Sequence, residues 1–362
     1  MRSIALQVVL FQVLGVAVAA AEAPPVRCER LTFSVALMPG APANQTLVGY
    51  LCARGAIQHK TIQVLIHGGT YDHLYWDFPF EPETYSYVEA VTAAGYATLA
   101  LDRIGSGESS HPAPGIALNL RVGAFTVHQV VQALRAGLLL VPAFGFVRAE
   151  RVMLVGHSLG SFIAVAEAGT FGDVDGVLLS SFAHVSGPST ILARQLVYPA
   201  AFDPKFAGSG LPLDYLTTLP GRRDDLFYFT PMADPEVIAV DEELKQTVTV
   251  GELIDGPNVT PLAINIHVPT FISIGDFDFF GCFPPSCTAY DFLGKELTPA
   301  NYSADACVEG AIIPEMGHDQ NLHVNAQDWF DVALEWADRR VGASTKTPPP
   351  QPCPSSEVRS RS

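Results

Sequence analysis

The amino-acid sequence predicts an α/β fold with a mostly parallel central sheet and helices on both of its faces. Two observations support this prediction. Between residues 61 and 181, short apolar runs typical of buried strands alternate with longer segments typical of helices, as in repeated βαβ units. The chain has 362 residues, of which 48% are hydrophobic, and this suits one large domain with an insertion rather than two unrelated domains.

The predicted elements follow one another along most of the chain. Two strands, 28–38 and 45–54, are expected to pair around a turn that contains Pro and Gly. Further strands are expected at 61–66, 96–101, 151–155, 174–179, 268–274 and 311–313, and helices near 84–94, 122–141, 158–170 and 325–340.

A glycine-flanked serine is the most informative local feature. Ser158 lies in Gly-His-Ser-Leu-Gly at 156–160, directly after the predicted strand 151–155. A G-x-S-x-G sequence at a strand-to-helix corner is a nucleophile elbow, in which a strained turn exposes the serine hydroxyl. The glycines are needed because a β-carbon there would clash with neighbouring backbone.

Three further segments accompany the elbow. The strand at 61–66 ends in His-Gly-Gly at 67–69, where a backbone N–H can act as an oxyanion donor. The strand at 96–101 opens into the loop Asp-Arg-Ile-Gly-Ser-Gly-Glu-Ser. The short strand at 311–313 leads to His318, close to the end of the predicted folded region.

Together these motifs resemble the α/β-hydrolase superfamily, specifically its branch with a serine elbow, an H-G-G oxyanion loop and a D-R-x-G-x-G-x-S loop. The resemblance covers roughly residues 45–340 apart from a variable middle, and it implies the chain order serine, acid, histidine. Ser158 and His318 fit the first and last places. Backbone N–H groups of Leu159 and Gly69 are the expected oxyanion hole.

Two carboxylates compete for the place of the acid. The strand at 268–274 runs into Gly275, and the usual spacing of glycine plus three selects Asp278. Asp276 is the reserve candidate, and the loop 180–182 after the preceding strand has no carboxylate. The acid would hold the imidazole of His318 in the tautomer that takes the serine proton.

The other histidines are assigned no proton transfer. His67 and His157 occupy motif positions that normally serve packing and loop geometry, so we expect that role for both. The ten histidines show no H-E-x-x-H or C-x-x-C spacing, and no metal or other cofactor is predicted.

The alternation of strands and helices stops after 174–179. In a hydrolase core, an insertion at this point is typical of a cap that covers the active site. We therefore expect a core in two parts, 22–181 and 263–342, separated by a cap or lid at 182–262 that is rich in Pro, Asp and aromatic residues. Residues 343–362 are expected to form a disordered tail.

The N-terminus predicts export. Arg2 precedes a long apolar stretch and small residues, so 1–21 is predicted to be a signal peptide with cleavage after Ala19 or Ala21; a retained signal anchor is the alternative. No other stretch has 18 uninterrupted apolar residues. The balance of 21 basic and 37 acidic residues, 21 − 37 = −16, disfavours nucleic acid and anionic membranes as partners.

Cysteines and sequons agree with a secreted protein. All six cysteines follow the signal peptide, and an even number in an oxidising compartment favours disulfides. Cys28 and Cys52 lie almost symmetrically about their turn, so a cross-strand bridge is expected. Cys282, Cys287, Cys307 and Cys353 allow three pairings. The sequence also has three glycosylation sequons, at Asn44, Asn258 and Asn301.

The first functional hypothesis is a secreted serine hydrolase that cleaves an ester, lactone or thioester through an acyl-enzyme. An apolar acyl substrate would suit the aromatic residues that follow the oxyanion loop, surround the acid and occur in the cap, although these rings also suit simple packing of loops on the core. The second hypothesis is acyl transfer, carbon–carbon cleavage or cyclisation in secondary metabolism. The third is a non-catalytic binding protein on the same scaffold. The sequence leaves the oligomeric state open.

Overall fold

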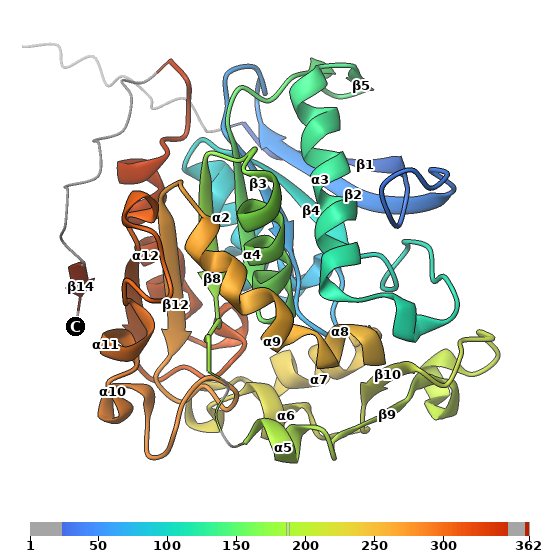
Figure 1. Cartoon of the computed structure of the whole chain (residues 1–362), viewed down its shortest axis with the longest axis vertical. Helices are drawn as coiled ribbons and strands as arrows, with labels where there is room; N and C mark the ends of the chain where they lie inside the picture. Colours follow the sequence, from blue (N-terminus) through green and yellow to red (C-terminus); the bar gives the residue numbers. More distant parts are fainter. Residues whose placement is uncertain (1–23, 186, 188, 347–358, 362) are drawn as a thin grey trace, which may run out of the picture.

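A nine-stranded sheet forms the centre of the protein (Figure 1). We describe it from a computed structural model, which covers residues 24–185, 187, 189–346 and 359–361. The strand order is β1-β2-β4-β3-β7-β8-β12-β13-β14. Strand β2 pairs antiparallel with β1 and β4, whereas β4, β3, β7, β8, β12 and β13 run parallel. The predicted mostly parallel sheet is confirmed.

The sheet strands agree closely with the predicted ones. Their bounds are β1 Val26–Val35, β2 Gln45–Arg54, β3 Ile62–Ile66, β4 Ala97–Asp102, β7 Val152–His157, β8 Gly176–Ser180, β12 Thr270–Gly275 and β13 Glu309–Ile313. Every residue of β3, β4, β7, β8 and β12 is buried, as expected for parallel strands covered on both faces.

Helices cover the two faces separately. Side chains of α3 (Leu120–Ala136) and α4 (Leu159–Phe171) pack with Val64 on one face. Leu65, the residue that follows Val64 in β3, packs with α2 (Tyr87–Ala93) and α12 (Ala326–Arg340) on the other face of the sheet. This alternation follows from the two-residue period of a strand. Short helices accompany them: α1 Pro82–Tyr85, α10 Cys287–Tyr290 and α11 Phe292–Glu296.

Helix α3 is shorter than the predicted segment 122–141. It begins after Asn119, whose side chain accepts the Val122 N–H, and it ends at Gly137, which has a φ of 71°. A left-handed glycine is a common helix C-terminus. The following residues form a hairpin of β5 (Leu139–Val141) and β6 (Gly145–Val147).

The predicted insertion lies beyond the carboxyl ends of the parallel strands (Figure 1). It contains a small sheet of β9 (Val197–Pro199), β10 (Tyr215–Thr218) and β11 (Val248–Thr249). Its helices are α5 Thr190–Ala193, α6 Arg223–Phe227, α7 Pro235–Leu244, α8 Val250–Ile254 and α9 Gly256–Val259.

The last part of this insertion packs on the core. The Asp255 carboxylate accepts the N–H of Leu120 at the start of α3. The Leu262 carbonyl lies 2.3 Å from where a β-carbon of Gly169 in α4 would stand, so only glycine fits there. We therefore use the term cap for residues 182–249 and assign 250–262 to the helical layer over α3 and α4.

Two parts of the segment 343–362, which is predicted to be a disordered tail, lie among the described residues. Residues 341–345, here termed the C-terminal clasp, bind the amino ends of β3 and β7. Thr61 donates its N–H to the Ala343 carbonyl at 2.9 Å, and Arg151 donates to the carbonyls of Val341 and Ser344. Residues 359–361 form β14 beside β13. Both the clasp and β14 bind through backbone groups, and amino-acid composition does not reveal such contacts.

Disulfides connect cysteines in the described part of the chain. Cys28 and Cys52 face each other in the β1–β2 register and are bonded, as predicted. Cys282 bonds to Cys287. Cys307 is also disulfide-bonded, while Cys353 and the predicted signal peptide 1–21 lie outside the described residues. Among the residues that are described, no helix is both long and apolar enough to span a membrane.

Candidate active site

The elbow brings Ser158 to the carboxyl end of the sheet. The serine lies between β7 and α4 with φ 52° and ψ −119°, a strained conformation for a residue with a β-carbon. A β-carbon at Gly160 would stand 2.0 Å from the Ile66 carbonyl oxygen, and one at Gly156 would stand 2.5 Å from Ser161 Cα. Both glycines are therefore required by the backbone packing around the turn.

Three of the predicted residues form one chain of hydrogen bonds. The Ser158 hydroxyl lies 2.7 Å from Nε2 of His318, and Nδ1 of His318 lies 2.8 Å from the Asp278 carboxylate. His318 and Asp278 are buried, and Ser158 is half-buried. This geometry allows the imidazole to accept the hydroxyl proton through Nε2 while Nδ1–H donates to the carboxylate.

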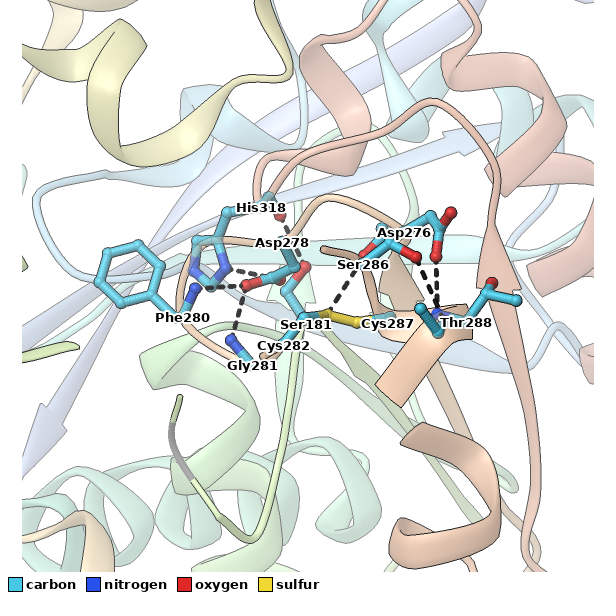
Figure 2. Close-up of a disulfide and its surroundings, with 12 residues drawn as sticks. Ser181, Asp276, Asp278, Phe280, Gly281, Cys282, Ser286, Cys287, Thr288 and His318 are labelled. Atoms are coloured by element: carbon cyan, nitrogen blue, oxygen red, sulfur yellow. Dashed lines mark hydrogen bonds and ion pairs between the residues drawn. A yellow bond between two sulfur atoms is a disulfide. The ribbon is translucent and has the colours of Figure 1, made fainter. Parts of the chain in front are cut away.

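The two candidate acids point in different directions (Figure 2). Asp278 points to His318 and also accepts the N–H groups of Phe280 and Gly281 at 2.8 and 2.9 Å. Burial would raise the pKa of Asp278, but His318 and these donors outweigh it and hold the pKa below its usual value. Asp276 instead accepts the N–H of Thr288 at 2.8 Å.

The Cys282–Cys287 disulfide closes the loop that carries both aspartates (Figure 2). Cys287 also donates its N–H to the Asp276 carbonyl at 2.8 Å. The side chain of Asp276 thus caps the short turn after the loop, and this role distinguishes it from Asp278. Spacing left the Cys282 pairing open because the turn that joins the two cysteines is not visible in sequence.

The two residues predicted to supply the oxyanion donors are Gly69 and Leu159, and Leu159 directly follows Ser158 at the start of α4. Neither the Gly69 N–H nor the Leu159 N–H donates to an acceptor within the described residues, so both are available to a ligand oxygen. A β-carbon at Gly69 would stand 3.3 Å from Val248 of the cap and 3.7 Å from Leu159. Val248, which the sequence analysis did not single out, therefore covers the oxyanion loop.

Arg103, in the D-R-x-G loop, braces that oxyanion loop. Its guanidinium donates to the Gly68 carbonyl at 3.1 Å and to buried Glu252, and its own N–H donates to His67 Nε2 at 3.1 Å. Burial, and then the nearby Arg103 charge, lower the pKa of His67 well below its usual value. A neutral His67 that orders the loop agrees with the predicted packing role.

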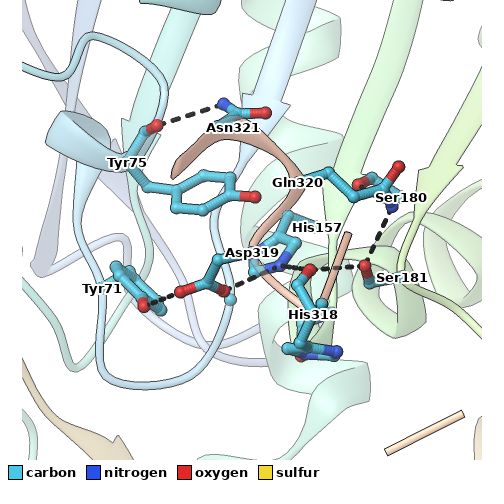
Figure 3. A network of polar contacts seen from close by, with 12 residues as sticks. Tyr71, Tyr75, His157, Ser180, Ser181, His318, Asp319, Gln320 and Asn321 are labelled. Atoms are coloured by element: carbon cyan, nitrogen blue, oxygen red, sulfur yellow. Dashed lines mark hydrogen bonds and ion pairs between the residues drawn. The ribbon is translucent and has the colours of Figure 1, made fainter. Parts of the chain in front are cut away.

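A buried polar network contacts the loop that carries His318 (Figure 3). His157 Nε2 lies 3.2 Å from the His318 carbonyl and 3.3 Å from the Asp319 carboxylate, and Tyr71 donates to the other oxygen of Asp319. The Ser181 hydroxyl donates to the same His318 carbonyl at 2.6 Å. Burial, followed by the Asp241 carboxylate, raises the pKa of Asp319 well above its usual range.

The network continues into the cap through a buried ion pair. Arg223 of α6 donates two hydrogen bonds of 2.8 Å to Asp241 of α7, a bidentate geometry. Tyr228 and Tyr71 also donate to Asp241, at 2.9 and 3.2 Å. Since Tyr71 contacts both Asp241 and Asp319, the cap is attached to the residue that follows His318. We term Arg223, Asp241 and Tyr71 the cap clamp.

Two aromatic residues line His318. The rings of Phe280 and Phe227 have centroids 4.4 and 6.0 Å from the imidazole. In contrast, Tyr75, Trp76 and Phe78, three of the aromatics after the oxyanion loop, are buried in the core. For these three rings, packing describes the structure better than the lining of a substrate pocket.

Three groups of His, Cys and carboxylate side chains are close enough in space to share a metal ion in the described part of the chain. They are Cys28–Cys52–Asp77, Asp72–His73–Asp102 and His128–Glu167–Asp173. None of them includes a residue of the Ser158, Asp278 and His318 arrangement.

The fold and the strained turn at Ser158 define a class of α/β proteins in which a serine lies at a strand-to-helix corner at the end of a parallel sheet. Comparison with known proteins identifies the family. The family model described as "Alpha/beta hydrolase family" matches residues 63–333, and the chain belongs to this family. No curated protein matches the sequence.

Solved structures share the fold at low sequence identity. An esterase from Thermogutta terrifontis is 17% identical with a TM-score of 0.57, and the match covers 85% of this chain and 97% of that one. A bromoperoxidase from Bacillus anthracis is 17% identical with a TM-score of 0.58, covering 86% and 100%. A monoacylglycerol lipase from Paleococcus ferrophilus is 16% identical with a TM-score of 0.51, covering 81% and 98%.

Proposed function

We propose that this protein is a secreted serine hydrolase that cleaves an ester, lactone or thioester with an apolar acyl group. The observation that carries the proposal is the continuous chain from the Ser158 hydroxyl through His318 to Asp278, with contacts of 2.7 and 2.8 Å. A nucleophile, a base and an orienting acid at hydrogen-bond distances are the parts that acyl transfer to a serine requires.

The proposed reaction has two steps. Ser158 Oγ attacks the substrate carbonyl carbon while His318 takes its proton, and the carbonyl oxygen becomes an oxyanion between the N–H groups of Gly69 and Leu159. The tetrahedral intermediate then expels the alcohol or thiol, which receives the proton from His318. Water, deprotonated by His318, attacks the acyl-enzyme in the same way and releases the acid and free Ser158.

The surroundings favour an apolar acyl group. Phe227 and Phe280 line the imidazole, and Val248 contacts the oxyanion loop. Burial of alkyl or aryl surface against such side chains stabilises the bound substrate by about 25 cal/mol per Å². A charged acyl group would lose its hydration there without gaining an ion pair.

A panel of chromogenic esters tests the proposal. Acyl chains of two to twelve carbons, aryl esters and lactones are compared by kcat/KM, with labelling of Ser158 by a fluorophosphonate probe as the parallel readout. We expect labelling at Ser158 and higher kcat/KM for longer apolar acyl groups. An unreactive Ser158 would instead favour a binding protein, and ester products formed in excess alcohol would favour acyl transfer.

Secretion is part of the same proposal and has its own test. The predicted signal peptide and the disulfides support it. Expression of the full chain in a secreting host should deliver protein to the medium with a new N-terminus after Ala19 or Ala21. Retention in the membrane with Met1 present would favour the signal anchor.

A further inference from the structure

A carboxylate lies buried where helix α4 is otherwise apolar. Glu167 is the sole charged residue of α4, and its exposed fraction is 0%. Neither of its carboxylate oxygens has a hydrogen-bond partner among the described residues. A carboxylate kept in such a place is costly unless a positive charge balances it.

Two further ligand groups face Glu167. His128 of α3 lies with Nδ1 3.6 Å from the Glu167 carboxylate and 2.9 Å from the carboxylate of Asp173, which follows α4. One oxygen of Asp173 also has no hydrogen-bond partner among the described residues. The three ligand atoms all lie within 4.8 Å of one another. Glu167 forms the buried floor of this cluster, while His128 and Asp173 are partly exposed and leave a path from solvent.

The separations fit a small transition-metal ion. Ligands at about 2.0–2.1 Å from a tetrahedral Zn²⁺ lie about 3.3 Å from one another, and the observed 2.9 and 3.6 Å lie on either side of that value. An imidazole with two carboxylates favours Zn²⁺ over Mg²⁺ or Ca²⁺, which prefer oxygen ligands. The His128 ring stacks on Phe171 with centroids 3.8 Å apart, and this contact holds the imidazole in place.

In a second cluster the carboxylates accept hydrogen bonds from other groups of the protein. In Asp72–His73–Asp102, Asp102 accepts the N–H groups of His73 and Glu108, and Asp72 accepts the N–H of Leu74 and the amide of Gln246. Its carboxylates have their partners within the protein. The open carboxylate oxygens of Glu167 distinguish the His128 cluster from it.

We propose that His128, Glu167 and Asp173 form a Zn²⁺ site that joins α3 to the end of α4, with water as the fourth ligand. Glu167 follows Ser158 by nine residues, or about 13 Å along a helix axis, so the ion would lie at the opposite end of α4 from the nucleophile. A cation there also interacts favourably with the negative end of the helix dipole. The proposal does not depend on the function of Ser158.

Calorimetry on the untagged, chelator-treated protein tests the site. We expect one equivalent of Zn²⁺ to bind and Tm to rise by about 4–8 °C at Zn²⁺ concentrations 100-fold above Kd. Co²⁺ in the same site should give the visible absorption of a tetrahedral complex. His128→Gln and Glu167→Gln should each weaken Zn²⁺ binding more than about 100-fold, with folding checked by circular dichroism.

His59→Gln is the matched control, because His59 forms an ion pair with Glu150 at the surface. It should leave Zn²⁺ binding and the Tm shift unchanged. Loss of binding in His59→Gln, or equal binding by wild type, His128→Gln and Glu167→Gln, would place the ion elsewhere and overturn the proposal. If wild type binds no Zn²⁺, the proposal is wrong, and a higher Tm of Glu167→Gln would then identify Glu167 as a buried neutral acid.

Discussion

The core loops around Ser158 and the cap that covers them are held by different means. Ser158 and Gly156 are positioned by backbone conformation within a few residues of sequence, and Gly160 packs on the end of the neighbouring strand β3 at Ile66. The cap is attached by side chains far apart in the chain, such as Tyr71 with Asp241 and Thr70 with Arg223. The contrast teaches that the proposed chemistry depends on short motifs, whereas access to it depends on long-range buried pairs.

The largest effect is expected at the nucleophile. Ser158→Ala should lower kcat for any ester substrate by about 10⁴ or more, because triad members act as a unit. The local elbow should survive, so Tm and circular dichroism should match wild type. Activity above a tenth of the wild-type value would exclude Ser158 as the nucleophile. The core loops around Ser158 would then not be the place of the proposed chemistry.

The next effect separates the two aspartates of one loop. Asp278→Asn should lower kcat by about 10³–10⁴, since an amide holds His318 in the wrong tautomer. Asp276→Asn should cost far less, because Asp276 faces Thr288. Steady-state kinetics of the two variants, prepared in parallel, give the ranking. The reverse ranking would transfer the role of the acid to Asp276.

A substitution in the cap clamp should lower the stability of the protein more than the reactivity of Ser158. Asp241→Asn leaves the guanidinium of Arg223 buried without its carboxylate, and breaking a buried pair costs about 3–5 kcal/mol. Limited proteolysis should cut first within 182–249, while a small fluorophosphonate probe still labels Ser158. Asp225→Asn is the control, because its exposed pair with Arg222 is worth about 0–1 kcal/mol. If both variants behave alike, the clamp does not hold the cap.

The smallest effect concerns His323, which joins the two regions. Its Nε2 accepts the N–H of Gly317 beside His318 and the N–H of Phe229 in the cap, at 3.0 and 2.9 Å. Burial lowers the pKa of His323 to about 4. The unfolded chain therefore binds the proton first as the pH falls. The stability that neutral His323 contributes is complete above about pH 6.5 and is lost towards pH 4, by up to about 3 kcal/mol.

Urea unfolding at pH 7 and pH 4.5 measures this difference. His323→Gln should shrink the pH dependence by about half or more of that amount, while His59→Gln, at an exposed position, should leave it as in wild type. An unchanged profile in His323→Gln would assign the acid sensitivity to other buried histidines such as His67.

The features that could be predicted are those that depend on residues close together in the sequence. The G-x-S-x-G motif placed Ser158, and the pairing of Cys28 with Cys52 followed from symmetry about one turn. The glycine-plus-three spacing selected Asp278, which the structure places against His318. Such patterns reflect local backbone geometry, which repeats wherever a strand meets a helix.

Other features depend on the finished fold. Arg103 and Glu252 are 149 residues apart, and nothing in either local sequence points to the other. Helix α3 was predicted too long because apolar residues continue past Gly137, whose left-handed backbone ends the helix. Glu167 was not singled out because only its burial beside His128 makes a lone glutamate unusual.

The C-terminal clasp lies at the end of the sheet away from Ser158. It binds the amino ends of β3 and β7, whereas Ser158 follows the carboxyl end of β7. Anchoring the protein to a bead or electrode through this end would therefore orient the cap and the proposed substrate entrance towards the solution. Truncation of the chain after Gly342 would delete Ala343, whose carbonyl accepts the N–H of Thr61. Immobilised forms of the protein should therefore retain the clasp.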